Sequence, residues 1–348
     1  MIAQISRRTF LLTAAAAAAC SRRENSSPLQ KAAQYLWAQQ AEDGGFHSIT
    51  YGLLRSGQSL TPFLLDALLA VPQTVLQARP AAVDNALGFI TKNTTADGAL
   101  GQMDETAADY PNYATALAVT AMVKAGRSGW QRHIAPMVAH LRAQQFNEAN
   151  GWKQEDPPYG AWGMGGPIRR PPDAGHVDLS MTRCVLEALQ AAGVPASDPI
   201  VANALVYLER SQNADGGFYF STVNPEINKA GEANGGFASY GTATADGLLA
   251  LRAAGVSPAD RRVAKAIQWL KDHHQPDKAP GFEGTARESW GSGLRFYYAY
   301  VVSRAMLGLP VSLPPQAADG SYRNANKMVK EDDPLIATAF AVQALARQ

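Results

Sequence analysis

Cysteine is scarce in this chain of 348 residues, which contains only Cys20 and Cys184. If Cys20 is consumed by processing near the N-terminus, no disulfide can form within the chain and Cys184 remains a lone thiol. An excess of charge is also lacking, because the formal net charge is +1. This balance gives no reason to expect nucleic acid or an anionic membrane surface as a partner. With 46% hydrophobic and 18% charged residues, the chain has the composition of a soluble globular protein.

A hydrophobic run long enough to cross a bilayer is missing as well. The apolar stretch 11–19 is far shorter than the roughly 20 residues of a transmembrane helix, and it follows the arginine pair Arg7 and Arg8. This arrangement is typical of a twin-arginine signal peptide. The stretch ends in Ala-Ala-Ala-Cys at Cys20, which resembles a bacterial lipobox with Ala where Leu is usual. We expect export to the periplasm, a lipid anchor on Cys20 that holds the protein to a membrane, and a polar tether over 21–28. The alternative is ordinary cleavage after an Ala-x-Ala site.

One short pattern recurs along the chain: Gln or Asn, then a turn such as Asp-Gly-Gly, then a large apolar residue. The copies begin at Gln40, Asn93, Gln145, Gln212, Gln275 and Gln316, and they end at Phe46, Leu100, Trp152, Phe218, Phe282 and Tyr322. Self-similarity with a period of tens of residues indicates a repeat architecture. Glycine supplies a positive φ and Asp caps the turn, so we interpret these loop residues as structural.

Two kinds of helix alternate around these loops. Amphipathic helices are expected before them, over 29–40, 81–92, 134–145, 200–211 and 260–271. Far more apolar helices are expected after them, over 60–71, 113–125, 179–192, 240–254, 296–307 and 335–346. Because helices that are apolar all round are buried and half-polar helices cover them, the alternation predicts an all-α fold, an α/α toroid of six hairpins over 29–348. The sixth hairpin lacks its outer helix, because 309–316 is too rich in proline.

The loops resemble those of the prenyltransferase/squalene-cyclase repeat superfamily, in which Gln…Asp-Gly-Gly-Phe/Trp loops brace neighbouring hairpins. The resemblance covers 29–348 and implies the same toroid. In squalene–hopene-type cyclases the protonating acid lies in Asp-x-Asp-Asp-Thr at the head of an inner helix. Here the matching stretch begins at Asp178, but Ser180 and Met181 replace the next two acids before Thr182. A hydroxyl near its normal pKa cannot protonate an alkene, so the resemblance implies that cyclisation by this route is lost.

Two other chemistries of the superfamily also lack their residues. Protein prenyltransferases bind zinc through an Asp-x-Cys pair and a distant His, whereas Thr182 stands two residues before Cys184. His176 and Cys184 do not have a common zinc spacing either. The thioester motif Gly-Cys-Gly-Glu-Gln of complement-type toroids is absent. We therefore expect no metal and no other cofactor.

The resemblance also suggests which side chains face the central lumen. The inner helices align on one recurring position, in four cases eleven residues before a Gly: Thr61, Thr115, Thr182, Thr244, Tyr297 and Thr338. In the cyclases the position two residues earlier faces the cavity, and helical spacing extends that face. Three carboxylates are then directed inward, from Asp66, Glu187 and Asp246, with Arg183 as an i, i+4 partner of Glu187. A cavity that folds hydrocarbons should carry aromatic rings instead. Alternatively, these charges hold the inner helices together and line nothing.

Long loops over 150–176, 221–239 and 283–294 gather at the pole that carries the N-termini of the inner helices. Long structured loops at one pole are usually functional, and the helix dipoles favour an anionic group there. The residues that we expect to bind a ligand are Tyr113, Trp162, His176, Asp178, Ser180, Arg183, Asp246, Arg295 and Tyr298. For His176 the alternative is a loop hydrogen bond without catalysis.

These features predict a toroid that binds a small, partly polar molecule at its loop-rich mouth. Cobalamin carriers such as transcobalamin use a similar helical barrel. An alternative is a diverged enzyme, either a terpenoid-type cyclase or a glycan hydrolase or lyase with Asp178 and Asp66 or Glu187 as acid and base. A third is an interaction scaffold. An open lumen with convergent carboxylates favours the enzyme, an open but acid-poor one the carrier, and a packed one the scaffold.

The processing prediction can be tested with two variants. Replacing Arg7 and Arg8 together by Lys should block export, because the pathway reads the arginine pair. Cys20→Ala should move the protein from the membrane fraction to the soluble periplasmic fraction, since the anchored thiol is gone. Cell fractionation with immunoblotting measures both effects. Membrane association that persists in Cys20→Ala would contradict the lipid anchor and leave export standing.

Overall fold

The computed structural model describes residues 26–103, 108–233 and 235–348. The predicted signal peptide and Cys20 lie outside the described residues. In the described ranges, no helix combines the length and the apolar character needed to cross a bilayer.

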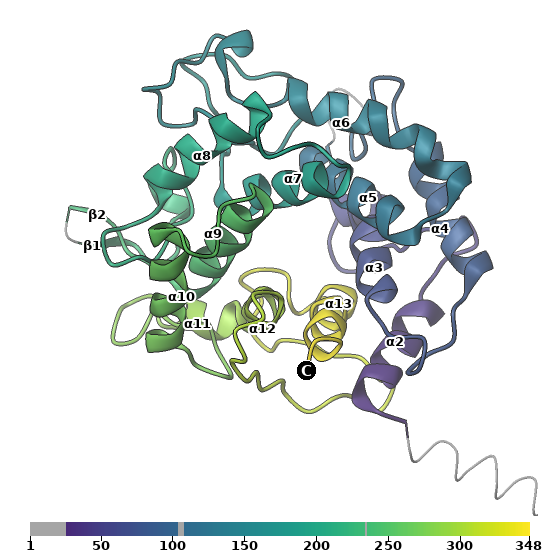
Figure 1. Cartoon of the computed structure of the whole chain (residues 1–348). Coiled ribbons are helices and arrows are strands. Elements are labelled where there is room, and N and C mark those ends of the chain that lie inside the picture. Colours follow the sequence, from purple (N-terminus) through teal and green to yellow (C-terminus); the bar gives the residue numbers. More distant parts are fainter. Residues whose placement is uncertain (1–25, 104–107, 234) are drawn as a thin grey trace, which may run out of the picture.

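An inner ring of helices surrounds the centre of the molecule (Figure 1). In the described part of the chain its members are α3 (Leu60–Leu69), α5 (Pro111–Ala125), α7 (Leu179–Ala191), α9 (Gly241–Ala253), α12 (Arg295–Arg304) and α13 (Pro334–Leu345). Each helix packs against the next, and α13 packs against α3, so the ring closes. These helices are buried nearly all round: in α13 every residue from Pro334 to Ala344 is buried.

An outer layer covers the ring. Its helices, among the described residues, are α2 (Pro28–Ala38), α4 (Pro80–Lys92), α6 (Ile134–Ala143), α8 (Pro199–Ser211) and α10 (Arg261–His273). They bury one stripe only, as α10 does with Val263, Ala266, Trp269 and Leu270. This contrast between half-buried and fully buried helices is the one that the sequence displays. The predicted all-α toroid is therefore confirmed.

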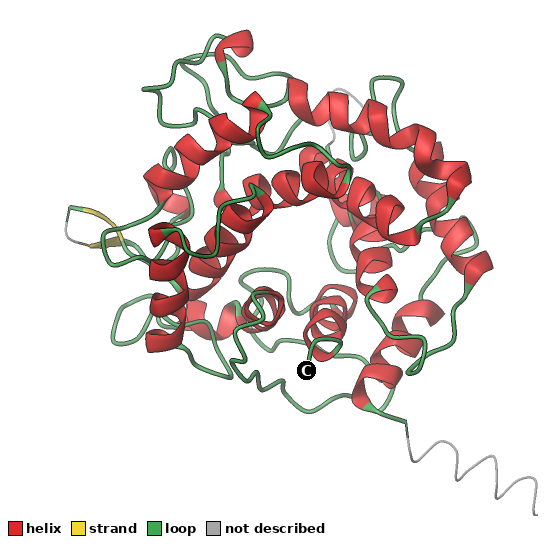
Figure 2. Ribbon diagram, in the orientation of Figure 1, coloured by secondary structure: helices red, strands yellow, loops and turns green. Residues whose placement is uncertain are grey.

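The proline-rich segment 309–316 closes the outer layer without a helix, as predicted, and it runs between α10 and α2 (Figure 2). The Ser312 N–H donates to the Pro276 carbonyl at 2.7 Å, and the Gln316 amide donates to the Pro28 carbonyl at 3.0 Å. The shorter elements are η1 (Leu53–Ser56), η2 (Ser128–His133), η3 (Glu148–Asn150), η4 (Pro225–Ile227), α11 (Ser289–Gly293) and the antiparallel strands β1 (Glu232–Ala233) and β2 (Gly236–Phe237). In that strand pair Glu232 lies opposite Phe237, and Ala233 opposite Gly236.

The repeated loops tie each hairpin to the next outer helix. The Gln212 side-chain amide donates to the Gly216 carbonyl at 3.0 Å and to the Arg262 carbonyl, in the first turn of α10, at 2.9 Å. The same pair of bonds links three other copies to the following outer helix through Gln40, Gln145 and Gln316. Gly216 has a φ of +92°, and a Cβ there would lie 2.7 Å from the Lys265 side chain. Only glycine fits this approach without strain.

The recurring threonine of the inner helices holds the end of five of the loops in the described residues. The Phe218 N–H donates to the Thr244 hydroxyl at 3.0 Å, and this hydroxyl donates back to the Tyr240 carbonyl at 3.0 Å. Equivalent bonds join Phe46 to Thr61, Leu100 to Thr115, Trp162 to Thr182 and Tyr322 to Thr338. The threonine is thus a structural clamp between the loop and the inner helix.

The third copy of the loop does not end where the sequence pattern placed it. The Gln145 amide donates to the carbonyl of Gly160, and the residue at the threonine clamp is Trp162, not Trp152. The segment 147–158 is an insertion within the loop, and its own Asn150-Gly151 turn imitates the repeat. Because this turn has a composition similar to that of the repeat, the sequence pattern placed the end of the third copy ten residues too early.

The loop aromatic offers a test of the repeat assignment. Phe218 is fully buried and its ring lies against Gly247 of α9. Phe218→Ala should lower the free energy of unfolding by about 3–5 kcal/mol, because it removes a large buried side chain and leaves a cavity. Ile49→Ala is the control, since Ile49 is 87% exposed and should change little. Denaturant unfolding measures both variants, and equal stabilities would contradict the assigned packing.

Candidate ligand-binding site

A cavity of about 500 Å³ opens at the pole that carries the N-termini of the inner helices. We call it the mouth cavity. Its wall is mostly apolar, with aromatic rings from Phe63, Tyr110, Tyr113, Phe220, Trp290, Tyr297 and Phe340. At its floor, the Phe340 ring contacts Phe63 edge-on at 5.0 Å between centroids and stacks on Tyr300 at 5.2 Å. The expectation of carboxylates in place of aromatic rings is therefore wrong for this cavity.

Asp178 lies at the edge of the mouth cavity and caps α7. It accepts hydrogen bonds from the Met181 N–H at 2.8 Å, the Ser180 hydroxyl at 2.7 Å and His176 Nε2 at 2.8 Å. Burial raises the pKa of Asp178, but the bond to His176 and the other donors outweigh it and hold the pKa below its usual value. The carboxyl group is thus ionised at neutral pH and has no proton to donate to an alkene.

Carboxylates of the chain itself cap other inner helices at this pole. Asp109 accepts from the Ser59 N–H at 3.1 Å at the start of α3, and Asp333 from the Leu335 N–H at 2.8 Å in α13. Glu331 accepts from the N–H groups of Phe296 and Tyr297 at 3.0 and 2.8 Å, at the start of α12. The positive helix ends were expected to favour an external anion, but in α3, α7 and α13 the protein supplies a carboxylate itself, and in α12 it places the carboxyl group of Glu331 there.

Two lysines that were not singled out from the sequence also line the mouth cavity. Lys229 Nζ lies 3.5 Å from the centre of the Phe220 ring and 5.9 Å from that of Trp290. Lys330 Nζ donates to the Tyr110 hydroxyl at 2.9 Å. A lone lysine in a polar loop has no sequence signal that separates it from a solvated one, so only the fold identifies these two.

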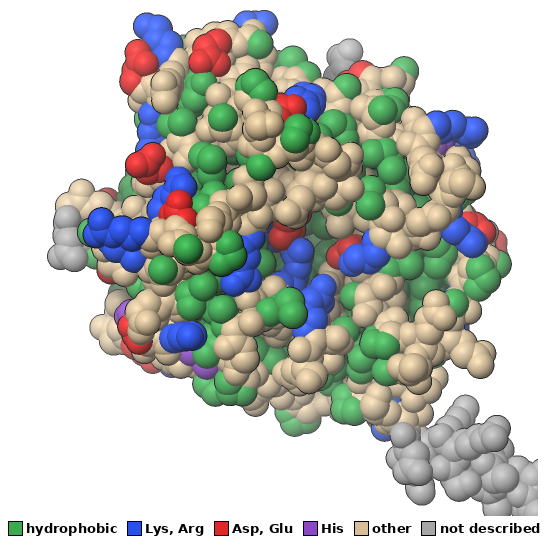
Figure 3. All heavy atoms as spheres, viewed as in Figure 1, with side chains coloured by type: hydrophobic (Ala, Val, Ile, Leu, Met, Phe, Trp, Pro, Cys, Tyr) green, Lys and Arg blue, Asp and Glu red, His purple; other side chains and the backbone are tan. Residues whose placement is uncertain are grey.

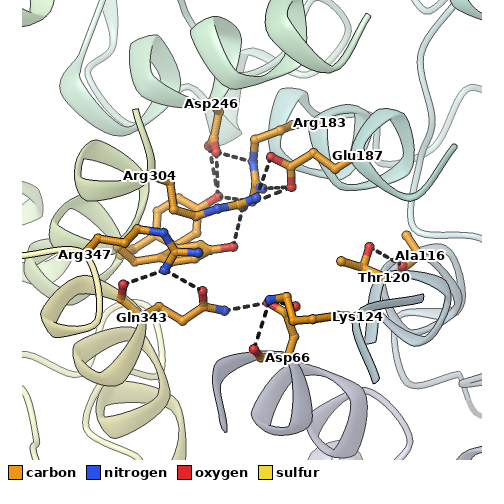
Figure 4. Close-up of polar contacts among 12 residues, drawn as sticks. Asp66, Ala116, Thr120, Lys124, Arg183, Glu187, Asp246, Arg304, Gln343 and Arg347 are labelled. Carbon is orange, nitrogen blue, oxygen red and sulfur yellow. Dashed lines mark hydrogen bonds and ion pairs between the residues drawn. The ribbon is translucent and has the colours of Figure 1, made fainter. Parts of the chain in front are cut away.

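Below the mouth cavity lies a network of ion pairs, in which Arg183 and Asp246 are fully buried (Figure 4). We call it the Arg183 network. Arg183 Nε donates to Asp246 at 2.7 Å and Arg183 Nη1 to Glu187 at 2.6 Å, while Arg304 pairs with Glu187 at 3.0 Å. The Tyr297 hydroxyl lies 2.9 Å from Asp246. Burial raises the pKa of Asp246 to about 6, against the opposing charge of Arg183. These charges join the inner helices to one another, which was the alternative interpretation.

Asp66 lies at the opposite pole of the lumen from the mouth cavity. Its carboxylate pairs with Lys124 and accepts from the Gln343 amide at 2.7 Å. Figure 3 views this pole and shows charged side chains gathered around a central hollow, and Figure 4 identifies Asp66, Glu187, Arg304 and Arg347 among them. Every carboxylate here already has a cationic partner within the described residues.

The three catalytic candidates do not form an acid–base pair. Glu187 lies nine residues after Asp178 on α7, which corresponds to about 14 Å along the helix axis. Glycoside hydrolysis needs two carboxyl groups within roughly 5–9.5 Å of each other. Asp66 and Glu187 are neutralised by Lys124, Arg183 and Arg304. The structure therefore separates Asp178 from both of its predicted partners.

The ligand-binding residues predicted from the sequence divide into three groups. Tyr113, His176, Asp178 and Ser180 line the mouth cavity. Arg183 and Asp246 lie below it in the Arg183 network, where neither side chain is exposed. The remaining three, Trp162, Arg295 and Tyr298, do not line the mouth cavity, so their prediction as ligand-binding residues is wrong.

Trp162 is fully buried between hairpins, and its indole N–H donates to the Leu141 carbonyl at 2.6 Å. It is the loop aromatic of the third repeat, so its role is structural. Arg295 points to the outer layer and donates to the Ser312 carbonyl at 3.0 Å. The Tyr298 hydroxyl meets His274 Nδ1 at 2.9 Å, also in the outer layer.

The last two errors have one cause, a shift of two residues in the alignment of α12. Gly308 follows Tyr297 by eleven residues, as glycines do in other inner helices, but α12 ends at Arg304. In the structure Tyr297 lines the mouth cavity as Ser180 and Thr242 do. Ala299 therefore occupies the position that the recurring threonine has in the other inner helices. Alanine has no hydroxyl, and the loop N–H of Phe282 donates to the Glu283 carboxylate instead.

Comparison with solved structures defines the fold class. A variant of the type II terpene cyclase MstE from Scytonema, in its apo form, has a TM-score of 0.54 at 14% identity, over 92% of this chain and 95% of that chain. A second variant, in complex with geranylgeranyl dihydroxybenzoate, has a TM-score of 0.57 at 13% identity, over 92% and 96% of the two chains. At these identities the likeness shows the fold, which is the toroid of terpene cyclases.

Sequence comparison identifies a family that the chain resembles. The family model of the squalene-hopene cyclase C-terminal domain matches residues 175–312. A squalene–hopene cyclase from Bradyrhizobium diazoefficiens is 34% identical over 160 residues, which are 45% of this chain and 20% of that protein. The chain thus matches only about a fifth of this relative's length. Together these matches confirm the predicted resemblance to the prenyltransferase/squalene-cyclase superfamily.

The buried cap of α12 predicts a pH dependence of stability. Burial raises the pKa of Glu331 to about 7, against its bonds to Asn324 and to the α12 N–H groups. The folded protein therefore keeps a proton that the unfolded chain loses, and the free energy of unfolding should fall as pH rises from about 4.5 to 7. Glu331→Gln cannot ionise and should reduce this fall by up to about 3 kcal/mol. Denaturant unfolding at several pH values measures the free energy of unfolding of the variant and of the wild type.

Glu226→Gln is the matched control, because Glu226 borders the same cavity but is exposed. Its unfolding profile should follow that of the wild type. A Glu331→Gln profile as steep as the wild-type profile would show that Glu331 is not the titrating group.

Proposed function

We propose that this protein binds an apolar small molecule with one polar end in the mouth cavity and does not cyclise it. The observation that carries the proposal is the combination of an aromatic wall with a polar rim. The volume of about 500 Å³ lies within the roughly 300–1,000 Å³ of small-molecule sites. The cavity is open at the mouth and the Arg183 network lies below it, so the lumen is not a packed core. Of the carboxyl groups that line the cavity, Asp178 and Glu331 cap helices and Glu226 is exposed, so they do not converge on a ligand as in an enzyme, and the open cavity favours a carrier.

An isoprenoid is the ligand class that we infer. Aromatic side chains bury large apolar areas and suit an unsaturated chain. The relatives support this inference, since one has squalene in its name and another was solved with geranylgeranyl dihydroxybenzoate. The rim residues Ser59, Ser180 and Thr242 add hydroxyl groups that can meet the polar end of such a molecule.

Cyclisation of the ligand is disfavoured by the state of the only carboxyl group that survives from the cyclase motif. Protonation of an alkene needs a strong acid that is neutral and aimed at the double bond. Asp178 is instead ionised and accepts three hydrogen bonds in its capping position. The Ser180 hydroxyl donates to Asp178, so it cannot replace the acid. The aromatic wall alone therefore binds without starting the reaction.

The glycan hydrolase or lyase alternative receives less support, because its carboxylates are separated and paired. An interaction scaffold is also less supported, since its lumen should be filled at the mouth. We further propose that the toroid is exported by the twin-arginine route and tethered to a membrane through Cys20. A tethered carrier would stand close to the membrane in which an apolar ligand dissolves.

Binding can be tested with geranylgeraniol, a C20 isoprenoid alcohol, by isothermal titration calorimetry on the processed protein. We expect saturable binding with one site per chain. Thr242→Phe should weaken it at least tenfold, because Thr242 lines the mouth cavity and a phenyl ring would fill part of it. Thr74→Phe is the control, since Thr74 is exposed on a loop outside the cavity. Equal weakening by both variants, or none by Thr242→Phe, would place binding elsewhere.

The same protein should leave its ligands chemically unchanged. Gas chromatography of extracts after incubation with squalene or geranylgeranyl diphosphate, with and without zinc, should return no cyclic product. A cyclic terpene formed by the wild-type protein and lost in Asp178→Asn would overturn the non-catalytic proposal and make Asp178 an acid.

A further inference from the structure

The polar groups of the mouth cavity differ in how many hydrogen-bond partners they have within the protein. Its carboxylates Asp178 and Glu331 each accept three hydrogen bonds from the protein. Lys330 donates to a tyrosine hydroxyl. Lys229 has no acceptor: within the described residues, its ammonium makes no hydrogen bond and has no carboxylate within 4.0 Å. Lys229 is half-buried, so its charge is partly withdrawn from water without a compensating partner, and it is the group on the cavity wall that is free to bind an acceptor.

Lys229 is held in place by its own loop. The buried Asn228 side chain accepts from the N–H groups of Phe220 and Ser221 at 2.8 and 2.9 Å, and it donates to the Ser221 carbonyl at 2.9 Å. These bonds fix Phe220 beneath the lysine, with its ring 3.5 Å from Nζ. The Lys229 carbonyl accepts from Arg287 at 3.2 Å. The ammonium is therefore positioned before any ligand arrives, and the ring uses only one of its three N–H directions.

We infer that Lys229 binds an acidic group, a carboxylate or a phosphate, at the polar end of the apolar ligand. The inference rests on the proposed function and adds the chemistry of the ligand head. An acid placed on Lys229 would have its hydrocarbon chain against the aromatic wall, where Phe220 and Trp290 lie beside the ammonium. It would supply the hydrogen-bond acceptors that Lys229 lacks and offset its desolvation.

The charged groups around Lys229 allow an anion to bind. Asp246 on α9 is paired with Arg183, and Asp178 on α7 accepts three hydrogen bonds from its own neighbours, so neither carboxylate forms an ion pair with Lys229. Glu226, on the same loop, is exposed to solvent. Arg287, which contacts the Lys229 backbone, adds a second positive charge on this side.

The charge of Lys229 makes the binding sensitive to pH. Burial lowers the pKa of Lys229 to about 8, although the charges of Asp178 and Asp246 act in the opposite direction. The ammonium is therefore mostly charged at pH 7 and mostly neutral at pH 9.5. An acidic ligand should bind more weakly at the higher pH, whereas a neutral ligand should not.

The test compares ligands that share one chain and differ in the head: geranylgeraniol, geranylgeranoic acid and geranylgeranyl phosphate. Calorimetry on the processed protein at pH 7 should give at least tenfold tighter binding for one or both acids than for the alcohol. The two acids distinguish a carboxylate from a phosphate as the preferred head. The preference should disappear in Lys229→Met and persist in Lys229→Arg, which keeps the charge. Lys153→Met, an exposed lysine outside the cavity, is the control and should keep the full preference.

The outcomes separate this inference from the proposed function. Equal affinities for the alcohol and both acids would overturn the role of Lys229 and leave the isoprenoid cavity standing. An acid preference that survives in Lys229→Met, or that is unchanged at pH 9.5, would also overturn it. Failure of all three ligands to bind the wild type would overturn both proposals. Thermal unfolding of each variant shows whether it is folded, and Lys229→Arg distinguishes loss of charge from loss of structure.

Discussion

The hydrogen bonds of the repeated glutamines are the constraint on which the ring depends. Gln40, Gln145 and Gln212 each join their own loop to the first turn of the next outer helix, and Gln316 joins the last loop to α2, the first helix. One such bond contributes only about 1 kcal/mol. Its importance lies in position, because the loop glycine beside it must touch the next helix, as Gly320 does at Lys31. Segment 309–316 keeps this contact although it forms no helix, so the circle closes.

The closure of the ring determines where polar and charged side chains can lie. With all inner helices parallel, their N-termini meet at one pole and their C-termini at the other (Figure 1). The first pole is provided with capping carboxylates, and the second with the ion pairs of Asp66 and Glu187. Between them, the Arg183 network lies in a region where no member could remain unpaired. An apolar cavity is left only above this network, bounded by the long loops.

The fold could be predicted closely because its signals are periodic. The difference between α10, apolar on one stripe, and α13, apolar throughout, is visible in the sequence and decides which layer each helix occupies. The site could be predicted only in part. Asp178 and Ser180 were found through a motif, whereas Trp162 was misassigned because an insertion displaced its loop. Lys229 carries no pattern, since its importance comes from Phe220 and Asn228 around it, and a contact of this kind exists only in the folded chain.

Binding and catalysis are separable in this toroid because they depend on different atoms. The cavity wall comes from the faces of several helices, so it survives the change of one side chain. Proton donation at the position of the cyclase motif depends on a single acid, and Asp178 is held ionised there while it caps α7. The N-cap accepts hydrogen bonds from the Met181 N–H and from His176, and these bonds stabilise the ionised form, whereas protonation of an alkene needs the neutral form. A second acid at position 180 would be needed to divide these two tasks, and Ser180 instead adds one more donor to Asp178. Under the proposed function, the same hydrogen bonds that stabilise the helix would therefore keep the ligand intact.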